Sequence, residues 1–183
     1  MTFTYIVRVV SLFLCSIIRY INNMVRLVKI NSKNVWDVIK LDIDDSQKNY
    51  VATNTESIIE AYTTIAANGV AYPFGIYDGD LLVGFLMIGY GIDDDWDNAP
   101  EFAKNAYSLW RLMIDFKYQG KGYGRQAMKA ALDFIKTFPN GPAEHVYLSY
   151  MPDNIAARNL YLSLGFEETD EKEDDEVVAI LKL

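Results

Sequence analysis

Three glycines stand close together after an apolar run, where a strand turns into a helix. Gly120, Gly122 and Gly124 follow the run from Leu109 to Ile114. Glycine reaches backbone angles closed to other residues, and without side chains the amide N–H groups can converge on an anion. A helix that begins at about Gly122 adds free N–H groups and the positive end of its dipole. The loop therefore predicts a phosphate or pyrophosphate site, and a purely structural turn is the alternative.

Two familiar nucleotide motifs do not fit this loop. No Gly-Lys pair followed by Ser or Thr closes a four-residue gap, so the Walker pattern is absent. The dinucleotide fingerprint fails as well, because the glycines are spaced Gly-x-Gly-x-Gly and lie late in the chain. The pattern that does fit is Gln-x-x-Gly-x-Gly, with Gln119, Gly122 and Gly124 at its named positions.

A second group of residues with chemical potential follows between residues 154 and 166. Its members are three or four residues apart, which places them along one helix face: Asn154, Ala157, Arg158 and Tyr161. Leu160 and Leu164 lie toward another face, so one face can serve a ligand and the other the core. Simpler interpretations stay open for Asn154 as an N-cap and for Arg158 as a solvated charge.

The two motifs together resemble those of the GCN5-related N-acetyltransferase (GNAT) superfamily. The glycine loop resembles its acetyl-coenzyme A loop, and the later segment is similar to Asn-x-x-Ala-x-x-Leu-Tyr-x-x-x-Gly-Phe, with every named position present. The resemblance covers residues 24–183 and is closest to the bacterial spermine/spermidine (diamine) N-acetyltransferases, through Trp110-Arg111 and the run 115–122. It implies a mixed α/β (α+β) fold, in which helices flank a mostly antiparallel central sheet with one splayed pair of parallel strands.

This resemblance also implies acetyl-CoA as the acetyl donor, coenzyme A as a product and no metal. Pantetheine would pair with backbone groups of residues 112–114, and the pyrophosphate would sit on the amides of residues 120–125. Asn154 would hydrogen-bond the pantetheine arm. The cofactor-binding residues implied in this way are Leu112, Met113, Ile114, Gln119, Gly120, Lys121, Gly122, Tyr123, Gly124, Arg125, Asn154, Ala157 and Arg158.

Acetyl transfer needs a neutral amine, although an alkylamine has a pKa of about 10 and is mostly protonated at neutral pH. By analogy with the family, Tyr161 would give its proton to the coenzyme A sulfur, and a backbone N–H near Ile114 would polarise the carbonyl. Some relatives place a glutamate on the central strand, where this chain has Trp110-Arg111. We therefore expect proton removal through ordered water and a distant carboxylate, and assign no general base.

An acidic segment before the central strand is the candidate substrate site. Its carboxylates, which could pair with the separated ammonium groups of a polyamine, are Asp93, Asp94, Asp95, Asp97 and Glu101. Trp96 offers a face for a cation–π contact. Glu56 and Glu60, on a preceding helix, could join them. The alternative is a solvated loop that is acidic for solubility.

We expect acetyl transfer to spermidine, spermine or a related diamine. Within the same reaction class, an aminoglycoside, an amino acid or a protein amino terminus could replace the polyamine. A different class is a noncatalytic acyl-CoA-binding regulatory module. Because relatives commonly form dimers, we expect a homodimer.

Composition agrees with a small, acidic, one-domain protein. The 183 residues carry 25 Asp and Glu against 17 Lys and Arg, a formal charge of −8 that argues against nucleic acid and favours a cationic or small neutral partner. The single cysteine, Cys15, excludes an internal disulfide and a cysteine-based zinc site, so a cytoplasmic setting is the default. The single histidine, His145, is expected to pack at the start of a strand.

Residues 1–23 differ in character from the rest. The apolar run from Val7 to Ile18 is interrupted by Arg8 and is short for a membrane span. No small-x-small cleavage site follows it, as a signal peptide would need. We favour an extension, either from a misassigned start or as a loosely attached helix, over a membrane anchor. Residues 24–183 would then form the acetyltransferase domain.

The first half of that domain should position the acidic segment. The pattern predicts a strand at 25–30, an amphipathic helix that is capped by Ser32 or Asn34 and ends near residues 44–45, and a helix at 55–67. The second helix would bury Ile58, Ile59, Tyr62 and Ile65. These two helices would form one wall of a substrate cleft. A hairpin over 74–77 and 81–90 turns at Asp78-Gly79-Asp80.

The second half should position the two motifs. After the glycine loop, a helix buries Ala127, Met128, Ala131, Leu132 and Ile135 and stops near 139–142. A strand at 146–150 and a helix from 153 or 154 to 164 follow. Phe166 and residues 177–183 supply the closing strands. The acidic stretch 167–176 between them is expected to be a solvated turn.

Overall fold

Seven strands form one sheet in the order β1-β2-β3-β4-β5-β7-β6. The structure is a computed structural model that describes residues 25–183. Its strands are β1 (Arg26–Lys29), β2 (Val70–Asp78), β3 (Leu81–Tyr90), β4 (Tyr107–Ile114), β5 (His145–Tyr150), β6 (Glu167–Glu173) and β7 (Glu176–Lys182). Neighbouring strands are antiparallel, except that β4 and β5 run parallel. The predicted mixed fold with one parallel pair is confirmed.

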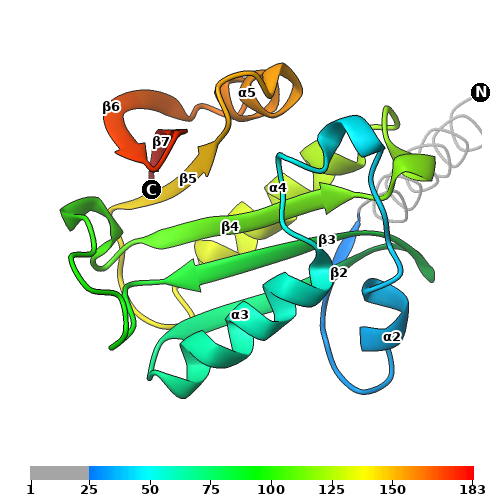
Figure 1. Cartoon of the computed structure of the whole chain (residues 1–183), viewed down its shortest axis with the longest axis horizontal. Helices are drawn as coiled ribbons and strands as arrows, with labels where there is room; N and C mark the ends of the chain where they lie inside the picture. Colours follow the sequence, from blue (N-terminus) through cyan, green and yellow to red (C-terminus); the bar gives the residue numbers. More distant parts are fainter. Residues whose placement is uncertain (1–24) are drawn as a thin grey trace, which may run out of the picture.

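Helices cover both faces of this sheet. They are α2 (Val35–Val38), α3 (Asn54–Ala66), α4 (Tyr123–Ile135) and α5 (Ile155–Leu162), with short 3₁₀ turns at Asp45–Gln47, Glu101–Ala103 and Phe116–Tyr118. Figure 1 shows α3 in front of the sheet and α4 behind it. Helix α5 lies beyond the end of β5, so the segment that carries the second motif is joined directly to the parallel strand pair.

Helix α4 packs as its sequence predicts. The five apolar residues expected to face the core are all buried: Ala127, Met128, Ala131, Leu132 and Ile135. They lie in the main hydrophobic core with buried side chains of β2, β3, β4 and β5. This packing fixes the helix against the sheet and thereby fixes the glycine loop at its start.

The predicted hairpin and histidine environments are also confirmed. Strands β2 and β3 turn through Gly79, whose φ of 57° lies in the left-handed region that glycine tolerates. His145 is the first residue of β5, and its Nε2 lies 2.8 Å from the carbonyl oxygen of Phe102. The imidazole therefore contacts the 3₁₀ turn that precedes β4.

Helix α3 has the expected extent but turns a different face to the sheet. Of the predicted buried stripe, Ile58 is half-buried against the core, and the prediction is wrong for the other three residues. The side chains it buries are small or polar: Asn54, Ser57 and Ala61. Ile59, Tyr62 and Ile65 are 58%, 74% and 55% exposed. Small side chains let the helix lie close to the sheet, and the amide of Asn54 donates to the carbonyl of Val38 at 2.9 Å. Periodicity identified the helix, but close approach to the sheet decided its orientation.

Helix α2 is shorter than predicted. It makes a single turn, of which only Val38 is buried, and Trp36 is 67% exposed. The amides of Lys40 and Leu41 then bond three residues back, as in a 3₁₀ turn, and the chain leaves the helix. The chain between α2 and α3 is consequently free to run past the glycine loop.

The acidic stretch expected to be a solvated turn is mostly strand, which corrects the prediction for residues 167–176. Glu167–Glu173 form β6, the edge strand of the sheet, and only Asp174 and Asp175 separate it from β7. An edge strand pairs on one side only, and charged residues there oppose pairing with another chain. The composition of this segment thus suits a sheet edge as well as a turn.

The predicted extension at residues 1–23 lies outside the described residues. Within residues 25–183, no helix is long and apolar enough to cross a membrane.

Candidate active site

Strands β4 and β5 separate soon after they begin. Their parallel register contains only the pairs Tyr107 with Val146 and Ser108 with Tyr147. Beyond them, β4 stays paired with β3 up to Ile114 while β5 runs away from it (Figure 1). The backbone of β4 from Leu109 onward therefore has no strand on its β5 side. A ligand with alternating donors and acceptors could pair there as a strand would.

The glycine loop lies at the far end of β4. Gly120 and Gly122 have φ of 73° and 82°, and Gly122 is the N-cap of α4. Without side chains at these positions, the first amides of α4 stay open to a bound anion. The predicted backbone geometry for an anion site is present.

Hydrogen bonds of two side chains fix the segment that leads into this loop. The carboxylate of Asp115 is buried and accepts from the amide of Lys117 at 3.0 Å, which caps the 3₁₀ turn before the glycines. The amide group of Gln119 donates to the carbonyl of Ile114 at 2.9 Å and to the side chain of Gln47 at 2.8 Å. Gln119 thus joins the loop to the end of β4 and to the segment before α3.

A cavity of about 760 Å³ runs between β4, the glycine loop and α5, and we call it the loop cavity. Most of the predicted cofactor residues line it: Leu112, Met113, Ile114, Gln119, Gly120, Gly122, Tyr123, Gly124, Arg125, Asn154 and Ala157. Its remaining wall includes residues 47–52. The structure therefore brings the two sequence motifs to one cavity from opposite sides.

Lys121 and Arg158, also predicted to bind the cofactor, are not among its lining residues. The ammonium of Lys121 donates to the carbonyl of Lys117 at 3.0 Å. Arg158 pairs with Glu168 of β6 at 2.7 Å, so the Glu168 carboxylate neutralises its positive charge. The cofactor role of both residues stays a prediction.

Asn154 has the capping role considered for it, and its hydrogen bond to pantetheine stays a prediction. It is the N-cap of α5, and its Oδ1 accepts from the amide of Ala157 at 3.1 Å. It also lines the loop cavity.

Tyr161 lies on the α5 side of the loop cavity. Its side chain is buried, with ring centroids 5.6 Å from Tyr150 and 6.0 Å from Phe166. Burial raises the pKa of its phenol well above the ordinary value, and the negative charge of Glu176 raises it further. Tyr161 is therefore protonated at neutral pH, as a group that donates a proton must be.

A second cavity, of about 970 Å³, is lined by residues 108–111 of β4 and 147–149 of β5, and we call it the acidic cavity. Of the five carboxylates predicted to bind substrate, Asp93 and Asp95 line it. Asp94, Asp97 and Glu101 do not. Asp94 accepts from the side chain of Asn68, and Glu101 pairs with Lys104 at 2.7 Å. The segment thus contributes to the cavity through two of its acids and Trp96.

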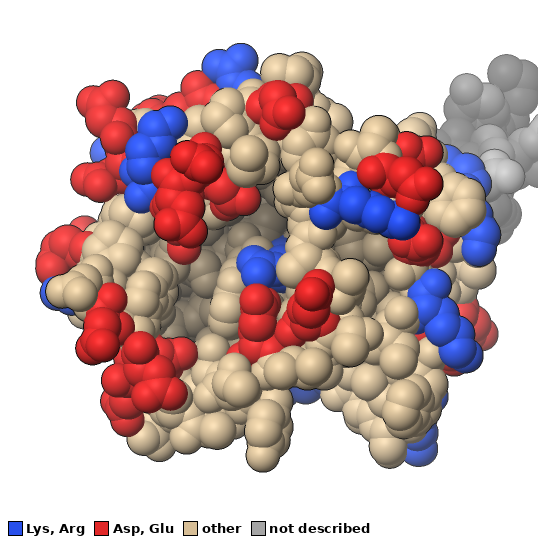
Figure 2. Space-filling model, viewed as in Figure 1, with Lys and Arg blue, Asp and Glu red and all other residues tan. Residues whose placement is uncertain are grey.

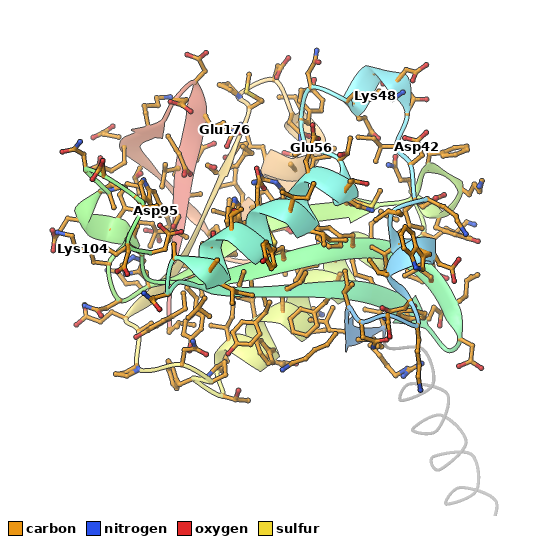
Figure 3. All side chains as sticks on the ribbon, turned by 60° about the horizontal axis from the view of Figure 1, so that its bottom comes forward. Asp42, Lys48, Glu56, Asp95, Lys104 and Glu176 are labelled. Carbon is orange, nitrogen blue, oxygen red and sulfur yellow. The ribbon has the colours of Figure 1, made fainter. Side chains whose placement is uncertain are left out.

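The sequence interpretation missed four further carboxylates in this cavity: Glu173, Asp174, Asp175 and Glu176. They come from the turn between β6 and β7 and face the segment that carries Asp95. In Figure 3, Asp95 and Glu176 lie toward the same end of the molecule. In Figure 2, a hollow on this face has acidic side chains at several places along its rim. The acidic stretch 167–176 was visible in the sequence. That it shares a cavity with residues 93–95 follows only from the order of the strands in the sheet.

Five residues line both cavities: Leu109, Trp110, Arg111, Ser149 and Glu176. The cavities therefore meet where β4 and β5 begin to separate. Strand β4 has a bulge at this point, because Met87 and Ile88 pair with Arg111 and Leu109 and leave Trp110 without a partner in β3. A bulge bends a strand and redirects its side chains and peptide groups.

Arg111 carries one of two positive charges in the acidic cavity, together with Lys172. Its guanidinium pairs with Glu60 of α3 at 2.9 Å and lies 5.6 Å from the ring of Trp110. By its position in the sequence, Glu60 is an additional candidate for a substrate carboxylate. Here it neutralises the arginine, which reduces repulsion of a cationic ligand.

No group of three His, Cys, Asp or Glu side chains within residues 25–183 could hold a metal ion. The site consists of a backbone edge, an anion loop, a buried phenol and a group of carboxylates.

Comparison with known proteins identifies relatives in sequence and in fold. Residues 36–166 match the acetyltransferase (GNAT) family. The chain is 32% identical to the spermine/spermidine N(1)-acetyltransferase of Bacillus subtilis over 148 residues, which cover 76% of this chain and 89% of that protein. It is 33% identical to the N-alpha-acetyltransferase RimI of Mycobacterium tuberculosis over 84 residues, 46% of this chain and 48% of that protein. The fold matches aminoglycoside acetyltransferase AAC(6′)-Ib, solved with coenzyme A, with a TM-score of 0.68 at 15% identity, covering 86% of this chain and 94% of the other.

Proposed function

The chain belongs to the acetyltransferase (GNAT) family and is therefore an acyl-CoA-dependent N-acetyltransferase; we propose that its acceptor is a primary amine of a polyamine such as spermidine or spermine. The observation that carries this proposal is the acidic cavity, in which six carboxylates from two facing segments adjoin the bulge of β4. The similarity to a spermine/spermidine N(1)-acetyltransferase over most of both chains supports the same substrate class.

A polyamine fits this cavity by its charge distribution. Its ammonium groups are separated by short apolar linkers, so one end can reach β4 while others stay near carboxylates. Asp93 and Asp95 would attract them from one side, and residues 173–175 from the other. Trp96 adds an aromatic face. Because Arg111 pairs with Glu60, the positive charge of Arg111 is partly neutralised and repels the polyamine less.

The loop cavity suits acetyl-CoA. The glycine positions leave space for a pyrophosphate at the start of α4, and the β5 side of β4 is unpaired beyond Ser108. We propose that residues 112–114 pair with pantetheine and that residues 120 and 122–125 hold the pyrophosphate. When bound, acetyl-CoA supplies the activated acetyl thioester.

The chain itself would contribute a proton and hydrogen-bond donors. Tyr161, held protonated by burial, would give its proton to the leaving sulfur. Peptide N–H groups of β4 at the bulge would stabilise negative charge on the carbonyl oxygen. This differs from the expectation of a donor near Ile114, because Ile114 lines only the loop cavity whereas residues 109–111 line both.

The proposal is tested by release of coenzyme A thiol from acetyl-CoA by the full chain. Spermidine, spermine, a short diamine, an aminoglycoside, a free amino acid and a peptide with a free amino terminus are compared as acceptors, with no acceptor as the control. We expect kcat/KM to be highest for a polyamine and to fall with added salt, which screens the carboxylates. Preference for a peptide or an amino acid would overturn the substrate assignment and leave the family intact.

An aminoglycoside is the second candidate, because it also carries several amines that six carboxylates can attract. The same acceptor series separates the two. The expected homodimer stays a prediction, which light scattering of the eluted protein would test.

A further inference from the structure

The junction between the cavities contains a single carboxylate, that of Glu176. Of the five residues that line both cavities, Glu176 and Arg111 are the charged ones, and Arg111 is paired with Glu60 at 2.9 Å. An acceptor amine in the acidic cavity must reach this junction to meet an acetyl group in the loop cavity. Glu176 is therefore the one carboxylate of residues 25–183 that lines both cavities.

The surroundings of Glu176 hold its carboxylate in place. It opens β7, is half-buried, and accepts from the hydroxyl of Ser149 through Oε2. Among the ion pairs of residues 25–183, none involves Glu176. One hydrogen bond orients the group, and its other oxygen is left for a ligand.

Glu176 also lies near the proposed acid. Its negative charge contributes to the raised pKa of Tyr161, second only to burial. The two groups are thus close enough to interact electrostatically across the junction. A proton that Glu176 takes from the amine can therefore be passed to the Tyr161 oxygen after Tyr161 has given up its own proton.

We propose that Glu176 is the catalytic residue that accepts the proton of the acceptor amine, an inference that rests on the proposed acetyl transfer but not on the identity of the amine. The ammonium form of the acceptor first gives one proton to solvent water, which leaves the neutral amine. As the nitrogen of this amine forms its bond to the acetyl carbon, it loses a second proton to Glu176. The bond from that carbon to sulfur breaks, and the sulfur takes the proton of Tyr161. Glu176 then returns its proton to the Tyr161 oxygen, so an amide and a free thiol leave and both side chains regain their starting states.

Other charged or titratable groups face this position from every neighbouring element. Glu173 of β6 is directly opposite Glu176 in the strand register. The remaining groups are Asp174 and Asp175 in the turn, Lys172 on β6, Arg111 on β4 with its partner Glu60 on α3, Tyr147 and Tyr150 on β5, and Tyr161 on α5. Glu173 lines the acidic cavity but not the loop cavity. A substitution of Glu173 therefore tests attraction of the amine without affecting proton transfer.

The test compares substitutions of Glu176 with the Glu-to-Gln substitution at two nearby positions. Glu176→Gln can still accept from Ser149 but cannot take a proton, so kcat should fall by about 100-fold or more while the KM for acetyl-CoA is unchanged. Glu176→Asp should recover part of the loss. Glu176→Ala should regain activity with added formate, which replaces the carboxylate; thermal unfolding reports whether each variant folds.

Two further variants complete the comparison. Glu173→Gln should mainly raise the KM for the amine, and Glu171→Gln, on β6 but outside both cavities, should match the wild type. Each variant is assayed with the amine that the wild type acetylates fastest. If Glu176→Gln only raises the KM for the amine, as Glu173→Gln does, or if formate has no effect, Glu176 is not the proton acceptor. A loss of kcat with a non-polyamine acceptor would uphold this inference and reject the proposed substrate, and a wild type inactive with every amine would reject both.

Discussion

Arg158 of α5 and Glu168 of β6 form a two-point ion pair, with Nε 2.7 Å from Oε1 and Nη2 3.0 Å from Oε2. The hydroxyl of Tyr150 donates to the same carboxylate. Arg158, followed by Tyr150, lowers the pKa of Glu168 to about 2. Burial, followed by the hydrogen bond to Glu168, raises the pKa of Tyr150 to about 12. The ion pair joins the helix that carries Tyr161 to the edge strand of the sheet.

This ion pair predicts a pH-dependent stability. Because the pKa of Glu168 is lower in the folded protein than its ordinary value of 4.5, its contribution is present above pH 4.5 and is lost as the pH falls toward 2. Glu168→Gln should therefore unfold at a lower temperature than the wild type at neutral pH, and the difference should shrink over that range. Thermal unfolding at several pH values measures it, with Glu171→Gln as the control. A difference that is the same at every pH would contradict the prediction.

Tyr161→Phe should retain acetyl-CoA binding and lose turnover. Removal of the hydroxyl leaves the buried ring in place but removes the proton for the leaving sulfur, which is worth about 100-fold or more in kcat. Calorimetry measures binding and thiol release measures turnover. Tyr62→Phe removes a phenol from a side chain that is 74% exposed on α3, so it serves as the control. An unchanged kcat for Tyr161→Phe would show that another group protonates the sulfur.

Gly122→Ala should weaken both the fold and acetyl-CoA binding. Its φ of 82° places a side chain in the left-handed region, which costs about 1–2 kcal/mol of the free energy of unfolding. Gly79→Ala, with a φ of 57° in the β2–β3 turn, should cost a similar amount. Only Gly122→Ala should raise the Kd for acetyl-CoA, because only Gly122 lines the loop cavity. Equal Kd values for the two variants would argue against pyrophosphate binding at this loop.

Asp95→Asn and Asp97→Asn should differ although both change the acidic segment by one charge. Asp95 lines the acidic cavity and Asp97 does not. An exposed charge pair is worth about 0.2–1 kcal/mol, so Asp95→Asn should raise the KM for a polyamine by up to about fivefold. Asp97→Asn should change it little. Equal effects would mean that the segment acts only through its total charge.

The parts of the fold that depend on local pattern could be predicted from the sequence. The face of α4 that carries Ala127 and Ile135, the hairpin at Gly79 and the cap at Asn154 each follow from spacing or backbone preference within one element. Two short motifs contain part of the lining of the loop cavity, including Gly122 and Asn154, whereas residues 112–114 were predicted from the family resemblance.

What could not be predicted depends on which elements meet. Tyr62 was expected to be buried, but it is exposed. The small residues on another face of α3 let that face pack against the sheet instead. Glu176 lies in an acidic stretch, and only the order β5-β7-β6 brings it to the junction with Trp110. The ion pair of Arg158 with Glu168 likewise joins a helix to a strand that the sequence places apart from it.

The unpaired side of β4 has a consequence for how this protein can change by mutation. A ligand that bonds to peptide groups makes few demands on the side chains of residues 112–114, so substitutions there that preserve the strand leave those bonds intact. The acidic cavity is built from side chains, and each substitution alters its shape or charge. Acceptor preference can therefore drift through single substitutions while recognition of the acetyl donor persists.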